Sequence, residues 1–268
     1  MVKPEIEFRT MDEDGDDTAF AQKAPEEVDQ TDIAWLELPT FEPKERHLAK
    51  KRIAANVRGP ARTAIDLMRT RLLRVIEEND WKRVMVTSPT PNCGKTTVAA
   101  NLGFAFQRQT ALRTIMMDFD LARADLGKSL GLKPTHDVAD HLMGDVRPTQ
   151  QMYRIKHNLA ISASNGGIDS QSDILKLPET QTRINEIDEI FAPDVMLFDF
   201  PPFFSNDDAI AASNFMDCAI IVGAAGETSV SQIDKAEREL SQYTDVAGIV
   251  LNKCRFVSEN RGYDYPYG

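Results

Sequence analysis

Residues 88–97 read Ser-Pro-Thr-Pro-Asn-Cys-Gly-Lys-Thr-Thr and stand between a short apolar run and a helical pattern of apolar residues. A loop that joins a strand to a helix in this way points its backbone amides and the helix N-terminus toward phosphate groups. Lys95 is then expected to reach the β and γ oxygens of a triphosphate, and the Thr96 hydroxyl to bind Mg²⁺. Pro89 stands where such loops usually carry their first glycine. The strand before and the helix after therefore carry the prediction, against the alternative of a surface turn with a stray lysine.

Strand and helix patterns alternate outward from this loop, beginning at residue 61. Short apolar runs, each ended by polar or turn residues, predict strands at 83–87, 113–118, 158–162, 194–199, 217–223 and 246–252. Helical spacing between them predicts helices at 61–78, 96–108, 137–143, 179–190, 207–214 and 229–242. This alternation is typical of an α/β fold whose sheet is mostly parallel and carries helices on both faces.

Three aspartates follow apolar strands of this predicted sheet. Asp118 and Asp120 end one strand, and Asp199 ends another. Because the carboxyl ends of strands in an open α/β sheet face the ligand crevice, the three carboxylates are expected to converge on the phosphate loop. Mg²⁺ takes one or two carboxylates with water and phosphate oxygens, which leaves one aspartate to accept a proton from an attacking hydroxyl. A single aspartate at such a place is often only a helix cap.

The charge of the chain is uneven. Its 268 residues include 42 acidic and 31 basic side chains, for a formal net charge of −11, which argues against a protein that binds the nucleic-acid backbone. The first 32 residues are rich in acids and poor in branched apolar residues, a composition that predicts disorder. An apolar patch around Trp35 follows, which could dock on the domain or on a partner. Residues 44–62 are basic and could meet anionic lipid or the acidic lead.

We expect four parts: an acidic disordered lead (1–43), a basic linker (44–60), an ATP-binding domain (61–258) and a tyrosine-rich tail (259–268). No apolar run approaches the roughly 18 residues that cross a bilayer, so a cytoplasmic chain with no transmembrane segment is expected. Three widely spaced cysteines fit neither a disulfide framework nor a zinc site.

The motifs around these residues resemble the bacterial tyrosine kinases of capsule and exopolysaccharide synthesis, whose cytoplasmic domain has the P-loop NTPase fold. The phosphate loop of that family, S-x-x-P-x-x-G-K-T, is matched by Ser88, Pro91, Gly94, Lys95 and Thr96. Its D-x-D motif is matched by Asp118 and Asp120, and its D-x-P-P motif by Asp199, Pro201 and Pro202. The resemblance runs from about residue 61 to the end of the sequence.

This resemblance implies ATP and Mg²⁺ as ligands and a role for each matched residue. The implied catalytic residues are Lys95, Asp118 and Asp120, with Asp120 as the base for a tyrosine hydroxyl. Thr96, Asp118 and Asp199 are the implied magnesium ligands. The nucleotide would contact the loop and, through its adenine, the end of the last strand, at Pro91, Asn92, Cys93, Gly94, Lys95, Thr96, Thr97 and Asn252.

The sequence also departs from the family pattern. Ala122 replaces the arginine that usually follows D-x-D, and Thr63 and Asp66 replace residues of the subunit-contact helix, where only Arg69 and Thr70 are kept. Thr90 replaces the signature lysine of the related partitioning ATPases, which disfavours that class.

Three of the five tyrosines, Tyr263, Tyr265 and Tyr267, lie in the last six residues. The resemblance implies that these are phosphoacceptors and that the kinase regulates polysaccharide polymerisation and export. It also implies recruitment to the inner face of the plasma membrane by a membrane-anchored polysaccharide co-polymerase, and possible homo-oligomers. The alternatives are an aromatic tail that packs on a surface, and a non-kinase ATP-gated switch that docks on the same partner.

Overall fold

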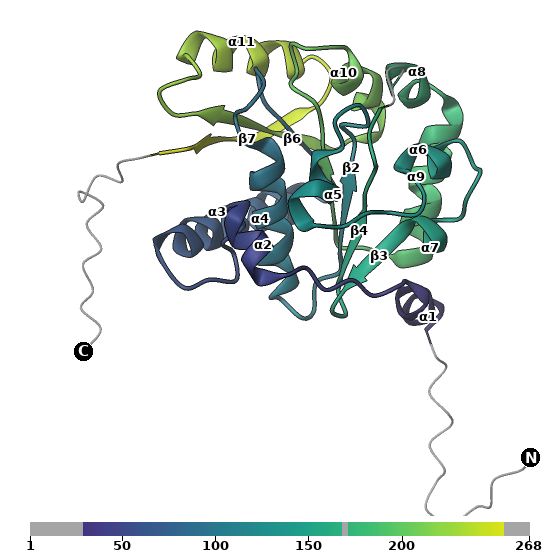
Figure 1. Cartoon of the computed structure of the whole chain (residues 1–268). Coiled ribbons are helices and arrows are strands. Elements are labelled where there is room, and N and C mark those ends of the chain that lie inside the picture. The colour runs from purple at the N-terminus through teal and green to yellow at the C-terminus, as the bar shows by residue number, and fades with distance from the viewer. Residues whose placement is uncertain (1–28, 168–170, 255–268) are drawn as a thin grey trace, which may run out of the picture.

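The computed structural model describes residues 29–167 and 171–254, which fold around one seven-stranded sheet (Figure 1). The strand order is β3-β4-β2-β5-β1-β6-β7, and every neighbouring pair is parallel except β3 and β4. In chain order the strands are β1 (Arg83–Thr87), β2 (Thr114–Asp118), β3 (Met152–Ile155), β4 (Leu159–Ser162), β5 (Val195–Asp199), β6 (Cys218–Ala224) and β7 (Asp245–Asn252). The predicted mostly parallel sheet is confirmed, and only the antiparallel edge strand β3 has no counterpart among the predicted strands.

Helices cover both faces of the sheet (Figure 1), as the alternation of patterns predicts. One layer consists of α2 (Glu45–Lys50), α3 (Pro60–Asn79), α4 (Lys95–Gln107) and α5 (Asp125–Leu130). The other layer consists of α1 (Gln30–Glu37), α6 (Val138–Leu142), α8 (Gln171–Leu175), α9 (Pro178–Phe191), α10 (Asp208–Ala212) and α11 (Val230–Leu240). The short helix α7 (Pro148–Gln151) leads into β3, and a single 3₁₀ turn (Ser213–Phe215) follows α10.

The central strand β1 shows why the apolar runs are continuous. Val84 and Val86 pack into the core on the α4 side, while Met85 packs into the core on the opposite side. Since successive side chains of a strand point to opposite faces, a strand covered on both faces needs apolar residues at every position. The sheet therefore has two cores, and the polar residues that end its strands lie together at its carboxyl edge.

Helix α4 lies unusually close to the sheet. A Cβ atom added to Gly103 would lie 2.0 Å from the Met116 sulfur on β2. A larger residue at this position would have to displace the Met116 side chain, and all but one of the helix residues after Lys95 and Thr96 are buried. The close packing fixes the position of the helix N-terminus, which carries the phosphate loop.

The expected boundary of the disordered lead, residue 43, differs from the structure. The indole Nε1 of Trp35 on α1 donates a hydrogen bond of 2.8 Å to the Phe191 carbonyl of α9, and the two rings pack edge to face. The apolar patch therefore docks on the domain. The basic linker is also packed, because the Asn101 side chain accepts hydrogen bonds from the amides of Ala54 and Ala55.

Within the two described ranges, no helix combines the length and the apolar character that crossing a membrane requires.

Candidate nucleotide site

The loop between β1 and α4 has the backbone shape that a phosphate loop requires. Asn92 and Gly94 both adopt positive φ angles, 65° and 88°. A Cβ atom on Gly94 would lie 2.3 Å from the side-chain nitrogen of Asn252, so this position requires glycine for its conformation and for space. Asn252, at the end of β7, donates a 2.9 Å hydrogen bond to the Cys93 carbonyl. In this structure Asn252 supports the loop, and its contact with adenine stays a prediction.

Lys95, the first residue of α4, forms a buried ion pair with Asp120. Its ammonium nitrogen lies 2.9 Å from the Asp120 carboxylate, and both side chains are nearly inaccessible to solvent. Burial by itself would lower the pKa of Lys95, but the negative charges of Asp199 and Asp120 outweigh it and raise the pKa above its usual value. Lys95 is thus held as a cation at the helix N-terminus.

Asp118 and Asp199 lie side by side because they are register partners on β2 and β5. The Asp118 carboxylate accepts hydrogen bonds from the amides of Leu126, at 3.1 Å, and Asp120, at 3.3 Å. Burial and the neighbouring carboxylate of Asp199 nevertheless raise the pKa of Asp118 well above its usual value. Both carboxyl groups occupy a place where negative charge is costly unless a cation is bound.

The Asp199 carboxylate is the clearest sign of an incomplete site. Both of its oxygens are buried, and no donor in the described part of the chain is aligned to form a hydrogen bond with either of them, although the Thr96 hydroxyl lies close by. Burial raises the pKa of Asp199 to about 6, although the nearby Lys95 ammonium and Thr96 hydroxyl act in the opposite direction. A buried polar group without a partner costs stability, so such a group indicates a missing ligand.

The donor set fits Mg²⁺ only if a nucleotide contributes to it. No group of three His, Cys, Asp or Glu side chains within residues 29–167 and 171–254 is arranged to hold a metal ion. Oxygen donors are nevertheless present in the unpaired Asp199 carboxylate and the nearby Thr96 hydroxyl, and hard oxygens are what Mg²⁺ prefers. Mg²⁺ usually keeps water and substrate phosphates among its ligands, which agrees with so few protein donors.

Two segments that the motifs do not include hold the loop in place. The amide of Phe203 donates to the Ser88 carbonyl at 2.7 Å, directly after the Asp199-Phe-Pro-Pro stretch. The Thr228 hydroxyl lies 3.4 Å from the Cys93 sulfur. Burial would raise the pKa of the Cys93 thiol, but its hydrogen bonds to Thr228 and Thr90 outweigh burial and lower that pKa. Thr228 is 135 residues from Cys93 in sequence, and no local pattern could have identified it.

The structure therefore brings together the loop residues, Lys95, Thr96 and the three predicted aspartates at the carboxyl edge of the sheet. The predicted phosphoacceptors Tyr263, Tyr265 and Tyr267 lie outside the described residues.

A family model described as the CobQ/CobB/MinD/ParA nucleotide binding domain (CbiA) matches residues 84–262. The chain belongs to this CbiA family. Membership places a nucleotide site in the domain, and the P-loop type of fold predicted from the sequence is confirmed.

Individual relatives of the chain carry more specific names. The chain is 25% identical over 252 residues to a "Putative tyrosine-protein kinase in cps region" of Klebsiella pneumoniae, covering 86% of this chain and 34% of that protein. It is 26% identical over 204 residues to the "Tyrosine-protein kinase YwqD" of Bacillus subtilis, covering 75% of this chain and 84% of that protein. The resemblance to bacterial tyrosine kinases is confirmed, while the chain spans only about a third of the length of the Klebsiella relative.

The fold is also similar to solved structures of such kinases. The kinase domain of the Escherichia coli tyrosine kinase ETK superposes with a TM-score of 0.69 at 21% identity, covering 81% of this chain and 84% of that one. This similarity supports the architecture described above.

Proposed function

We propose that this chain is an ATP-dependent protein-tyrosine kinase that acts in capsule or exopolysaccharide synthesis. The observation that carries the proposal is the buried Lys95–Asp120 ion pair beside the unpaired Asp199 carboxylate at the N-terminus of α4. A nucleotide-binding family and relatives named tyrosine-protein kinases support the same reading.

The phosphate loop would hold ATP through residues of one continuous segment. The backbone amides of residues 92–97 and the Lys95 ammonium would bind the phosphate oxygens. Thr96, Asp118 and Asp199 would hold Mg²⁺ directly or through water. The ion would supply positive charge that stabilises the transferring phosphoryl group. Binding of the cation would favour the ionised form of both Asp118 and Asp199, because a nearby positive charge stabilises a carboxylate.

Asp120 is the proposed base. In the structure its carboxylate is held by Lys95. When the Lys95 ammonium turns to the phosphates, Asp120 is free to accept the proton of a tyrosine hydroxyl, whose usual pKa near 10 makes such help necessary. The same ion pair thus keeps the base and the phosphate-binding lysine together until ATP separates them.

The proposed acceptors are Tyr263, Tyr265 and Tyr267, and the proposed setting is the cytoplasmic face of the plasma membrane. A membrane-anchored polysaccharide co-polymerase would recruit the chain there. Each phosphate adds roughly −1.5 to −2 charges to an acidic chain, so phosphorylation would favour separation of homo-oligomers.

A second candidate function is a non-kinase ATP-gated switch that docks on the same partner. It is favoured by Asp66, which replaces a residue of the family's subunit-contact helix and makes ion pairs within this chain, to Arg62 and Arg69 at 3.6 Å and to Arg108. Side chains that form ion pairs within one chain are not available to pair with a neighbouring subunit.

Conversion of Tyr263, Tyr265 and Tyr267 together to phenylalanine separates the two functions. The kinase proposal predicts that phosphotyrosine formed with ATP and Mg²⁺ disappears while nucleotide binding is unchanged. Phosphotyrosine that persists at another position would relocate the acceptor. If the unaltered chain binds ATP but never carries phosphotyrosine, even with its co-polymerase present, the switch replaces the kinase.

A further inference from the structure

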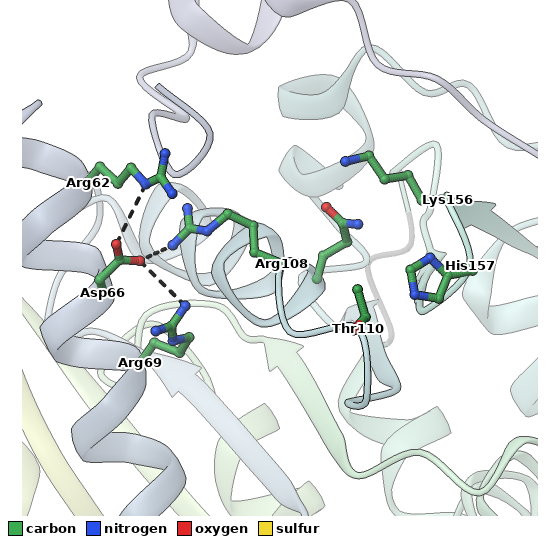
Figure 2. A pocket seen from close by; sticks show the side chains of 8 residues that line it. Arg62, Asp66, Arg69, Arg108, Thr110, Lys156 and His157 are labelled. Carbon is green, nitrogen blue, oxygen red and sulfur yellow. Dashed lines mark hydrogen bonds and ion pairs between the residues drawn. The ribbon is translucent and has the colours of Figure 1, made fainter. Parts of the chain in front are cut away.

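A basic pocket lies at the end of α4 that is opposite to Lys95, and Figure 2 shows the side chains that line it. We define it by six of its lining residues, Arg62, Asp66, Arg69, Arg108, Lys156 and His157. Its volume is about 580 Å³, large enough for several carboxylate groups. Arg62, Asp66 and Arg69 project from α3, Arg108 faces them from the end of α4, and Lys156 and His157 lie across the opening (Figure 2).

The basic pocket has more positive than negative charge. Three guanidinium groups share the single carboxylate of Asp66: Arg62 and Arg69 at 3.6 Å, and Arg108 in closer contact. Lys156 is exposed, and none of the carboxylates in the described ranges forms an ion pair with it. Four cations against one carboxylate leave an excess of three positive charges around one cavity.

Two further observations agree with an excess of positive charge in the pocket. The Arg69 Nε atom is buried and has no hydrogen-bond acceptor in the described residues. Burial and repulsion from Arg62 lower the pKa of Arg108 below its usual value. An anionic group in the basic pocket would supply the missing acceptor and reduce this repulsion.

The first described helix, α1, lines a second cavity that adjoins the basic pocket. Thr110 and His157 line the basic pocket and also a second cavity, whose wall includes Asp32, Trp35 and Leu36 of α1. The basic pocket and the cavity beside α1 are therefore neighbours on the surface.

The preceding sequence carries the complementary charge. Residues 12–17 read Asp-Glu-Asp-Gly-Asp-Asp, with five carboxylates in six positions. Eleven residues connect Asp17 to Asp29, and an extended chain of that length spans at most about 40 Å. Because the tether keeps the carboxylates near the surface, their effective concentration there is in the millimolar range.

We propose that residues 12–17 dock in the basic pocket of the same chain, with their carboxylates bound by Arg62, Arg69, Arg108 and Lys156. The contact is a set of intramolecular ion pairs at the first half of α3. It is independent of the nucleotide site and of the proposed kinase activity.

Carbodiimide cross-linking of the full chain tests this contact, because the reagent joins a carboxylate to a lysine amine only when the two groups touch. We expect peptides that link residues 12–17 to Lys156, with a yield at least about fivefold above links to Lys235. Lys235 is the control because it is exposed on α11, at the opposite end of the molecule (Figure 1). Raising NaCl from about 50 to about 500 mM should reduce the Lys156 links, since salt screens surface charges.

Two matched variants show whether the basic pocket is responsible. Arg62→Gln removes one cation of the pocket and should lower the yield of the Lys156 links at least about twofold. Arg71→Gln removes the same charge from an exposed position of the same helix, outside the pocket, and should leave the yield unchanged. An equal reduction by both variants would overturn the proposal, because it would indicate general attraction to a basic helix.

A mixture of unlabelled and nitrogen-15-labelled chains distinguishes the source of the carboxylates. Links within a single isotope type support the proposal. Links mainly between the two types would overturn it in favour of a second copy's lead, and links no more abundant than those to Lys235 would also overturn it. As an independent measurement, neutralising the five acids of residues 12–17 should raise amide hydrogen exchange of residues 60–69; unchanged exchange contradicts the proposal.

Discussion

The two ends of helix α4 differ in the sign of the charge that surrounds them. At the N-terminal end, Asp118, Asp120 and Asp199 surround the single cation Lys95. At the C-terminal end, Arg62, Arg69 and Arg108 surround the single carboxylate Asp66. Each end keeps an excess of one sign of charge, and the difference between them predicts opposite ligands: a metal with its nucleotide at one end and carboxylates at the other.

Burial decides how strongly each end depends on its ligand. Asp118 and Asp199 are almost completely inaccessible, whereas Arg62 and Asp66 are each about a third exposed. Water and salt screen exposed charges, so an exposed pair contributes only about 0.2–1 kcal/mol. Substitutions at the N-terminal end should therefore have large effects, and those at the C-terminal end small ones.

Among the substitutions that compare the two ends of α4, Asp120→Asn is expected to have the largest effect, and that effect is on the rate of phosphotransfer. Loss of the base should lower the rate of phosphotransfer about 100-fold or more. Nucleotide binding should not weaken, because Lys95 no longer has to leave an ion pair to reach the phosphates. Turnover at saturating ATP and titration with a fluorescent nucleotide analogue measure the two quantities. A rate that falls only because nucleotide binding falls would contradict the role of Asp120.

Asp199→Asn should change stability in a way that depends on pH. The pKa of Asp199 is raised to about 6 in the folded protein, so its carboxylate destabilises the fold as pH rises from about 4 to about 6. Without nucleotide, the variant should be more stable than the unaltered chain by about 1–3 kcal/mol at pH 8, and by less at pH 5.

Urea unfolding at the two pH values measures this difference. Glu189→Gln, which removes an exposed carboxylate of α9, is the matched control and should change stability little at either pH. An Asp199→Asn variant that is less stable at pH 8 would show that the carboxylate is already satisfied inside the protein.

The smallest effect is expected at the other end of α4. Arg62→Gln removes a partly exposed cation that lies 3.6 Å from Asp66, and should change the free energy of unfolding by less than about 0.5 kcal/mol. Thermal unfolding in low salt measures it. A loss of several kcal/mol would mean that the basic pocket is as strongly coupled to folding as the nucleotide site, and the comparison between the two ends would fail.

The residues of the nucleotide site can be predicted from sequence because each of its motifs is a short continuous segment. The loop at residues 88–97 and the aspartates at the ends of two apolar strands can each be recognised within a few positions. Their convergence then follows from the parallel sheet, in which Asp118 and Asp199 become register partners.

The basic pocket could not be predicted in this way. Arg108 reaches Asp66 across 42 residues, and Lys156 comes from a turn near the unpredicted strand β3. The docking of Trp35 on Phe191 spans 156 residues. Such contacts depend on how helices pack on the sheet, and no short pattern encodes them.

The central claim is that the Lys95 loop transfers phosphate to tyrosine. Mass spectrometry of the C-terminal peptide, from the chain isolated from its native host beside a Lys95→Met variant, tests it most directly. The account predicts phosphate on Tyr263, Tyr265 or Tyr267 that disappears in the variant, with both proteins folded by their melting profiles. Unmodified tyrosines in a chain that still binds ATP, or phosphate that persists in Lys95→Met, would contradict it.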